Sequence, residues 1–181
     1  MANQAVMNKY IIGAALAALV LGAVYMKTKP NKNVRLNNPL NIERRDKWDG
    51  LATVQKDKRF CTFTKPEYGF RAAYIILLKY LERDDNTITK IISKWAPSVE
   101  NHVEGYSSFV GQRVDKDVDS FVEPEDLPAI MLAMSDFEGA KGAYNIDIVN
   151  RGVAIARESN LVIARLEVIE ENTSLYERWL G

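Results

Sequence analysis

The chain has 181 residues, 47% hydrophobic and 27% charged, which suits one globular domain with an appendage and is short for two full domains. Its 24 bases and 24 acids balance, but five bases precede the first acid, which leaves 19 bases against 24 acids in residues 36–181. This net charge of −5 favours no nucleic-acid partner. A lone cysteine excludes an internal disulfide and a lone histidine excludes a histidine-rich metal site, so we expect no metal and no cofactor.

An uncharged apolar run extends from Tyr10 to Met26. As a helix, its 17 residues would span about 25 Å, enough for a short membrane crossing. Tyrosines flank the run and lysines close it, as is typical of residues at a membrane interface. We therefore predict an N-terminal membrane anchor over residues 1–27, followed by a polar linker over 28–34. A cleaved signal peptide is the alternative, although the following Met-Lys-Thr-Lys is a poor cleavage site.

The rest of the chain divides into a loop region and a helical region. Residues 36–63 show no persistent helical period, so loops with a small hairpin are expected there. Beyond Pro66 the apolar residues recur with helical spacing. The expected helices cover residues 67–82, 88–95 with Thr87 as N-cap, a segment around 103–110, residues 125–138 ended by Gly139, and a segment around 148–156. Residues 158–181 form a C-terminal extension to which the pattern assigns no role.

Four motifs follow one another between Arg35 and Asn101. They read Arg-Leu-Asn-Asn-Pro-Leu-Asn-Ile-Glu, Lys-Trp-Asp-Gly, Pro-Glu-Tyr-Gly-Phe-Arg-Ala-Ala and Trp-Ala-Pro-Ser-Val-Glu-Asn. Together with a later Glu-Gly pair they resemble phage virion-associated lysozyme-like lysins and lytic transglycosylases, which attack peptidoglycan. The resemblance implies a mainly α, lysozyme-like domain over residues 35–157 behind an N-terminal transmembrane helix. In related enzymes the helix with the catalytic acid comes before the Asn-Asn and Trp-x-Gly elements, so the order here implies a circularly permuted core.

Glu138 is the candidate catalytic residue. Cleaving a glycosidic bond requires a proton donor at the leaving oxygen, and apolar surroundings favour the protonated form of a carboxyl group. Glu138 follows Met134 by four residues and Met131 by seven, which places it on the apolar stripe of its predicted helix. In lysozyme-like enzymes the general acid likewise ends a helix before a small residue, here Gly139. The alternative is an ordinary solvated residue at a helix end.

Seven further residues are candidates for substrate binding. Amide and carboxylate groups suit sugar hydroxyls and N-acetyl groups, and aromatic rings can stack on sugar faces. For the asparagines among them, which lie in the Asn-Asn-Pro-Leu-Asn motif, the alternative is turn formation. For the two aromatic residues it is core packing. For the Glu-Asn pair after Pro97 it is helix capping. The candidates are Asn37, Asn38, Asn41, Trp48, Tyr68, Glu100 and Asn101.

Three other features carry weaker signals. Glu43 is a distant rival to Glu138 for the role of acid. The Asp-x-Asp-x-Asp spacing from Asp115 resembles the start of a calcium loop, but Ser120 stands where glycine is needed, so a solvated turn is the better interpretation. His102 is expected to be a surface or helix residue rather than a base.

The predicted reaction is lytic transglycosylation of peptidoglycan, in which Glu138 acts first as acid and then as base, because no motif supplies a second carboxylate at a fixed spacing. The expected partners are peptidoglycan glycan strands, a lipid membrane bound through Tyr10 to Met26, and other virion proteins. The expected location is a single-pass protein of the virion membrane or particle that acts in the host periplasm. The alternatives are a muramidase or glucosaminidase, a non-catalytic structural virion membrane protein whose lysozyme-like domain binds the wall, and a bacterial inner-membrane protein of phage origin.

Overall fold

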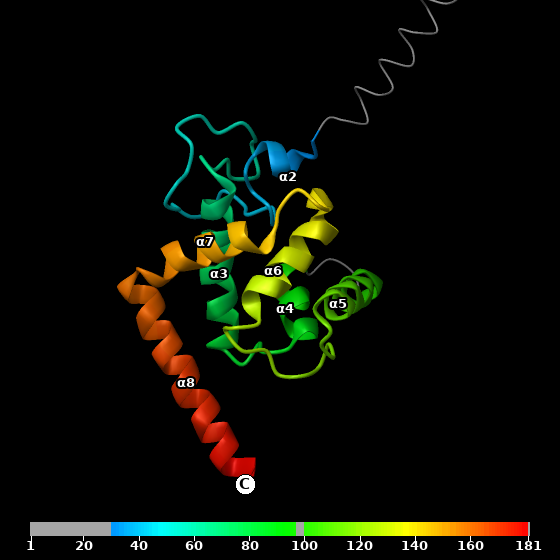
Figure 1. Ribbon diagram of the computed structural model, residues 1–181, viewed down its shortest axis with the longest axis vertical. Coiled ribbons are helices and arrows are strands. Elements are labelled where there is room, and N and C mark those ends of the chain that lie inside the picture. Colours follow the sequence, from blue (N-terminus) through cyan, green and yellow to red (C-terminus); the bar gives the residue numbers. More distant parts are fainter. Residues whose placement is uncertain (1–29, 97–99, 181) are drawn as a thin grey trace, which may run out of the picture. The chain divides into compact units, whose positions relative to one another are not determined.

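A computed structural model describes residues 30–96 and 100–180 of the chain. Residues from Lys32 onward form one unit, divided from Met1–Asn31, and the described part of that unit is mainly helical (Figure 1). Its elements, in chain order, are α2 (Lys32–Arg35), α3 (Pro66–Leu81), α4 (Ile88–Trp95), α5 (Glu100–Val114), α6 (Leu127–Ser135), the π-helical turn η1 (Asp136–Ala140), α7 (Ile146–Arg157) and α8 (Asn160–Leu180).

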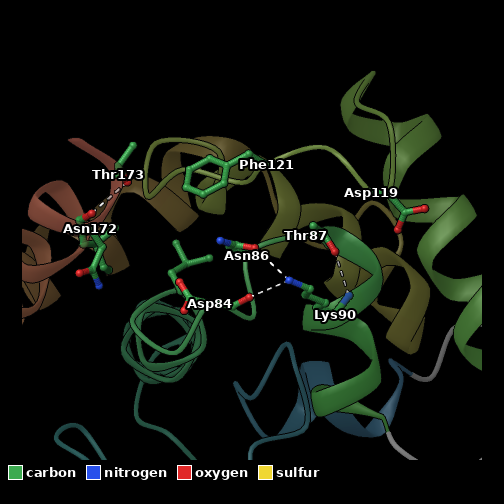
Figure 2. A pocket seen from close by; sticks show the side chains of 10 residues that line it. Asp84, Asn86, Thr87, Lys90, Asp119, Phe121, Asn172 and Thr173 are labelled. Atoms are coloured by element: carbon green, nitrogen blue, oxygen red, sulfur yellow. Dashed lines mark hydrogen bonds between the residues drawn. The ribbon is translucent and has the colours of Figure 1, made fainter. Parts of the chain in front are cut away.

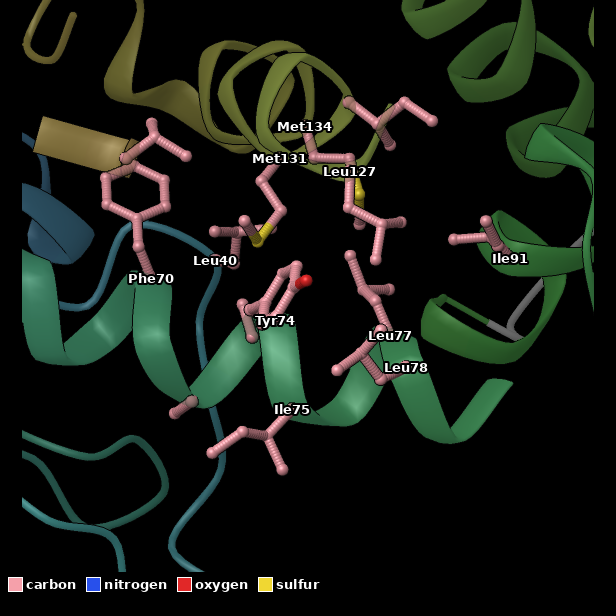
Figure 3. Packing of buried hydrophobic residues seen from close by; sticks show 14 of the residues in the cluster. Leu40, Phe70, Tyr74, Ile75, Leu77, Leu78, Ile91, Leu127, Met131 and Met134 are labelled. Atoms are coloured by element: carbon pink, nitrogen blue, oxygen red, sulfur yellow. The ribbon is translucent and has the colours of Figure 1, made fainter. Parts of the chain in front are cut away.

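Helix α3 lies at the centre of the packing and contacts α6, α7 and α8. It begins at Pro66, a residue suited to a helix start because the first turn has no partner for its N–H. Tyr74 and Leu77 of α3 are fully buried, and Figure 3 shows Leu127 and Met131 of α6 pointing toward them. Each such buried side chain contributes about 1.5–3 kcal/mol of hydrophobic stabilisation, so this α3–α6 contact anchors the core.

Helix boundaries follow local signals in the sequence. Thr87 caps α4, its hydroxyl accepting a hydrogen bond from Lys90 N at 3.2 Å, as predicted. Asn145 caps α7 in the same way, its side-chain oxygen accepting from Ile148 N at 3.1 Å. The predicted helix over 125–138 is shorter than expected, because α6 ends at Ser135 and the chain continues as η1.

Residues 36–63 form irregular loops rather than a hairpin with paired strands. Two isolated antiparallel bridges join this segment to itself, Glu43 with Phe60 and Leu51 with Phe63. Leu40 and Phe63 nevertheless lie in the hydrophobic core, 1% exposed each. The loops are therefore held by burial and by side-chain hydrogen bonds to the backbone, not by a ladder.

The predicted lysozyme-like fold with an N-terminal transmembrane helix requires correction. No helix within residues 30–96 and 100–180 is both long and apolar enough to cross a membrane. The longest, α8, has 21 residues but carries charged side chains such as Arg165, Glu167 and Glu170 along its length. The predicted span from Tyr10 to Met26 lies outside the described residues. The findings support a mainly helical fold and no finer class, and the single-pass membrane location is not supported.

Helix α8 covers most of the segment that the sequence separated as an extension. Its residues Val162 and Ile169 are 0% and 4% exposed and join the core cluster. Arg165 forms an ion pair with Glu82, just beyond the end of α3. The helix is thus packed onto the same unit as α3.

The crossing of α3 and α7 depends on Gly152. A Cβ at this position would lie 2.6 Å from the backbone oxygen of Glu67 and 2.9 Å from Phe70 Cβ. We predict that Gly152→Ala destabilises the chain by about 1–3 kcal/mol, because the helices must separate to admit the methyl group. Chemical denaturation of the full-length chain measures this.

Gly105→Ala is the matched control, since a Cβ on that glycine of α5 meets nothing within 4 Å. This substitution should stabilise α5 by up to about 1 kcal/mol through helix propensity. Equal effects of the two substitutions would show that the α3–α7 crossing is not tightly packed.

Candidate functional site

Glu138 lies in η1, a turn wound differently from an α-helix. The π-helical winding shifts side chains away from the period of α6, so Glu138 does not simply extend the stripe of Met131 and Met134. Gly139 follows with φ of 98°, a left-handed conformation that favours glycine and ends the helical segment, as the sequence predicted. Turns of this kind are frequent at functional sites.

The Glu138 carboxylate is half-buried and held at both oxygens. The Asn41 side-chain amide donates to Oε2 at 2.8 Å, and the Tyr106 hydroxyl donates to Oε1 at 3.2 Å. The Asn33 amide donates to the Glu138 backbone oxygen at 3.1 Å. Two segments far apart in the sequence, residues 33–41 and α5, therefore converge on Glu138, and the bonds from Asn41 and Tyr106 fix the direction of its carboxylate.

Tyr106 places a fully buried hydroxyl at this carboxylate. Its ring stacks on Phe137 with centroids 3.9 Å apart and planes at 15°. Burial raises the pKa of Tyr106 far above its usual range, and the Glu138 charge raises the pKa further. The hydroxyl consequently keeps its proton near neutral pH and can donate it in a hydrogen bond. The helical period predicts Tyr106 on a helix face but does not predict this contact, although a buried tyrosine hydroxyl needs a polar partner.

The three candidate asparagines near the start of the domain have different positions. Only Asn41, in a left-handed turn with φ of 55°, reaches Glu138. Asn37, also left-handed, donates to the backbone oxygens of Phe63 and Thr64 at 3.1 and 3.2 Å. The turn-forming alternative therefore describes Asn37, and Asn41 combines a turn with a site contact.

Asn38 is fully buried. Its amide nitrogen donates to the backbone oxygens of Ile42 and Cys61 at 2.9 Å each, and its oxygen accepts from Ile42 N at 2.8 Å. Because the side chain is enclosed and bonded to backbone, the expected sugar contact is corrected to a structural role.

Trp48 and Tyr68 are half-buried and pack against the core cluster. The buried indole N–H of Trp48 has no hydrogen-bond partner within the described part of the chain. The Tyr68 ring lies directly beside Gly50, and Asp49 forms an ion pair with Arg71 of α3. These contacts join the Trp-Asp-Gly and Pro-Glu-Tyr-Gly motifs to each other and favour the core interpretation for both aromatic residues.

Glu100 and Asn101 begin α5, the helix that also carries Tyr106. The structure does not describe their side chains, so their predicted contact with substrate lies outside the described parts.

Glu43, the rival acid, is bound by two arginines. Arg59 donates to Oε1 and Arg45 donates to Oε2, at 2.8 and 2.7 Å. The hydrogen bond from Arg59, followed by Arg45, holds the pKa of Glu43 below its usual value. A carboxyl group that remains ionised cannot deliver a proton near neutral pH, so Glu43 does not suit the role of acid.

The aspartates after α5 form a turn. Asp117 Oδ1 accepts a hydrogen bond from Asp119 N at 2.9 Å, and Lys116 pairs with Asp126 at 2.8 Å. Within residues 30–96 and 100–180, no group of three or more His, Cys, Asp or Glu side chains is placed to hold a metal ion.

A cavity of about 430 Å³ lies at the C-terminal end of α3, where Leu81 meets the start of α4 and one side of α8 (Figure 2). Phe121, Asn86 and Asn172 are among its lining residues, and Lys90 Nζ donates to the Asp84 backbone oxygen at 2.9 Å within it. None of the residues predicted for the site lines this cavity. We do not connect it with Glu138.

Comparison with known proteins places the chain among phage proteins. No family model matches it. It is 32% identical over 143 residues to "Protein P5" of Pseudoalteromonas phage PM2, an alignment that covers 75% of this chain and 89% of the relative. The chain belongs to the phage protein P5 family. The name of this P5 relative states neither an activity nor a ligand, so the chemistry of the family must be argued from the site.

The role of Asn38 in this P5-family chain can be tested by stability. Asn38→Ala leaves the buried Ile42 N–H and Cys61 carbonyl without partners, while the Ile42 carbonyl keeps its hydrogen bond from Cys61 N. Because each unpaired buried group costs about 1–3 kcal/mol, we predict a loss of at least about 2 kcal/mol or failure to fold. Urea denaturation of the full-length chain measures the change. Asn37→Ala, at a half-buried position, is the control and should cost less. If the Asn38→Ala chain is as stable as the unmodified chain but binds glycan more weakly, Asn38 contacts the glycan and its role is not structural.

Proposed function

We propose that this P5-family protein is a peptidoglycan-degrading enzyme of a phage, a lytic transglycosylase with Glu138 as its catalytic residue. One observation carries the proposal: a half-buried carboxylate held at both oxygens by Asn41 and Tyr106 in an irregular helical turn. Enzymes keep acid–base groups in fixed, partly enclosed positions of this kind. The motif resemblance to wall-degrading phage proteins and the phage origin of the relative support the same conclusion.

In the proposed reaction, protonated Glu138 gives its proton to the oxygen that bridges N-acetylmuramic acid and N-acetylglucosamine. The bond from that oxygen to C1 of N-acetylmuramic acid breaks, and the glucosamine side leaves as an alcohol. The Glu138 carboxylate then accepts the proton of the C6 hydroxyl of the same muramic acid, whose oxygen bonds to C1. The product is a 1,6-anhydro sugar, no water is consumed, and Glu138 returns to its protonated form.

The surroundings of Asp136, the other carboxylate in η1, favour a scheme in which Glu138 is the only catalytic carboxyl group. Asp136 precedes Glu138 by two residues, but its side chain is 3% exposed. It pairs with Arg113 at 3.2 Å and accepts a hydrogen bond from Gly142 N at 3.2 Å. A carboxylate committed to an arginine and a backbone amide is poorly placed to attack a sugar or to activate water, as retaining or inverting hydrolysis would require.

Replacing the catalytic carboxyl group tests the enzyme hypothesis. We predict that Glu138→Gln in the full-length chain lowers the clearing of purified sacculi at least a thousandfold, because the amide cannot donate the proton. Glu104→Gln, the same chemical change at an exposed position of α5, should leave clearing unchanged. Unaltered clearing by Glu138→Gln would reject the catalytic assignment. Absence of clearing by the unmodified chain would favour a structural wall-binding protein.

The nature of the products separates transglycosylation from hydrolysis. We expect the soluble fragments to end in anhydro-muramic acid and to be lighter than hydrolytic products by one water. Mass spectrometry of the fragments makes the distinction. Ordinary reducing ends would show that the protein is a muramidase or glucosaminidase instead.

The Tyr106 hydroxyl supplies a further test. Tyr106→Phe keeps the stacked ring but removes one of the two donors to Glu138, so we predict a fall in the rate of clearing of about tenfold, equivalent to about 1.4 kcal/mol. Circular dichroism should confirm that the variant is folded. A rate equal to that of the unmodified chain would mean that this hydrogen bond does not orient the reacting group.

A further inference from the structure

One face of α5 runs along η1. His102, Tyr106, Phe109 and Arg113 are spaced by four, three and four residues, which places them on a single face of the helix. We call this set the α5 stripe. Each member contacts η1: the rings of His102, Tyr106 and Phe109 lie 5.8, 3.9 and 5.4 Å from the Phe137 ring, and Arg113 pairs with Asp136. The stripe therefore borders Glu138, which follows Phe137 directly.

The α5 stripe is enclosed at its centre and open on either side. Tyr106 is fully buried, Phe109 is half-buried, and His102 is exposed. The His102 ring stands edge-on to Phe137 at 82° and to Tyr106 at 84°. An exposed ring supported in this way can offer a rigid apolar surface to solvent, since its neighbours limit its rotation.

Arg113 is the last member of the stripe, and its guanidinium group is exposed on one side and contacts an acid on the other. Its side chain is 59% exposed, whereas that of its partner Asp136 is 3% exposed. The contact with Asp136 is a single one, from Nη2 at 3.2 Å. A guanidinium group has five N–H donors, so several have no partner among the described residues and can reach an external carboxylate.

We propose that the α5 stripe is the binding surface for peptide-bearing glycan strands, with His102 and Phe109 against sugar faces and Arg113 against a carboxylate of the stem peptide. This inference rests on the proposed function and names the substrate contacts beside Glu138. Aromatic rings bind the apolar face of a sugar whatever the peptide, whereas an arginine selects for an anionic group. The surface thus distinguishes peptidoglycan from an uncharged glycan such as chitin.

Binding to the inactive Glu138→Gln full-length chain tests the inference, because binding is then measured without cleavage. The two probes are a soluble peptidoglycan tetrasaccharide with stem peptides and N-acetylglucosamine tetramer, which carries no charge, each measured by titration calorimetry. Adding Arg113→Gln should weaken binding of the peptide-bearing probe about tenfold and leave that of the tetramer unchanged. Adding His102→Ala should weaken both several-fold.

Arg151→Gln is the matched control, because that arginine of α7 is 57% exposed and also pairs with one acid, Glu67. It should alter neither affinity. If the Glu138→Gln chain binds both probes and the Arg113 and His102 variants bind like the control, the inference is overturned while the proposed function stands. If a folded Glu138→Gln chain binds neither probe, both proposals fail.

Discussion

The buried side-chain amide of Asn38 holds together residues 36–63, the segment that supports the candidate site and has no β-ladder. Residues 36–63 have two isolated bridges and a few single backbone hydrogen bonds, and the backbone groups that these leave unpaired depend on side chains for partners. Asn38 supplies such a partner to Ile42 N and to the Cys61 oxygen from a position with no exposure to solvent. Because Asn41 lies within the turn that this amide closes, the hydrogen bond from Asn41 to Glu138 depends on the same network.

The site itself is assembled from three parts that meet only in the folded chain. The Asn-rich loop supplies Asn41, α5 supplies Tyr106, and η1 presents Glu138 between them. Buried residues of α3 and α6 form part of the hydrophobic core, whereas polar contacts set the direction of the carboxylate. Without the loop or α5, the Glu138 carboxylate would lose the hydrogen bond from Asn41 or that from Tyr106.

The motifs of the sequence have a structural explanation that is separate from catalysis. Asp49 pairs with Arg71, Tyr68 lies beside Gly50, and Asn37 bonds to the backbone at Phe63 and Thr64. The first two contacts join residues from different motifs, so these motifs mark the docking of the loop segment onto α3. A motif match alone therefore does not distinguish a residue that touches substrate from one that holds the scaffold.

The sequence by itself determined the helical segments between Pro66 and Arg157, the Thr87 cap and the break at Gly139, because these depend on local periodicity and local hydrogen bonding. Tertiary structure alone decided which asparagine reaches Glu138, that Tyr106 completes the site, and that α6 passes into a π-helical turn. The first two depend on hydrogen bonds between residues 97 and 32 positions apart, which no local pattern records. The fold class was also beyond local signals, since the same helices can pack in several architectures.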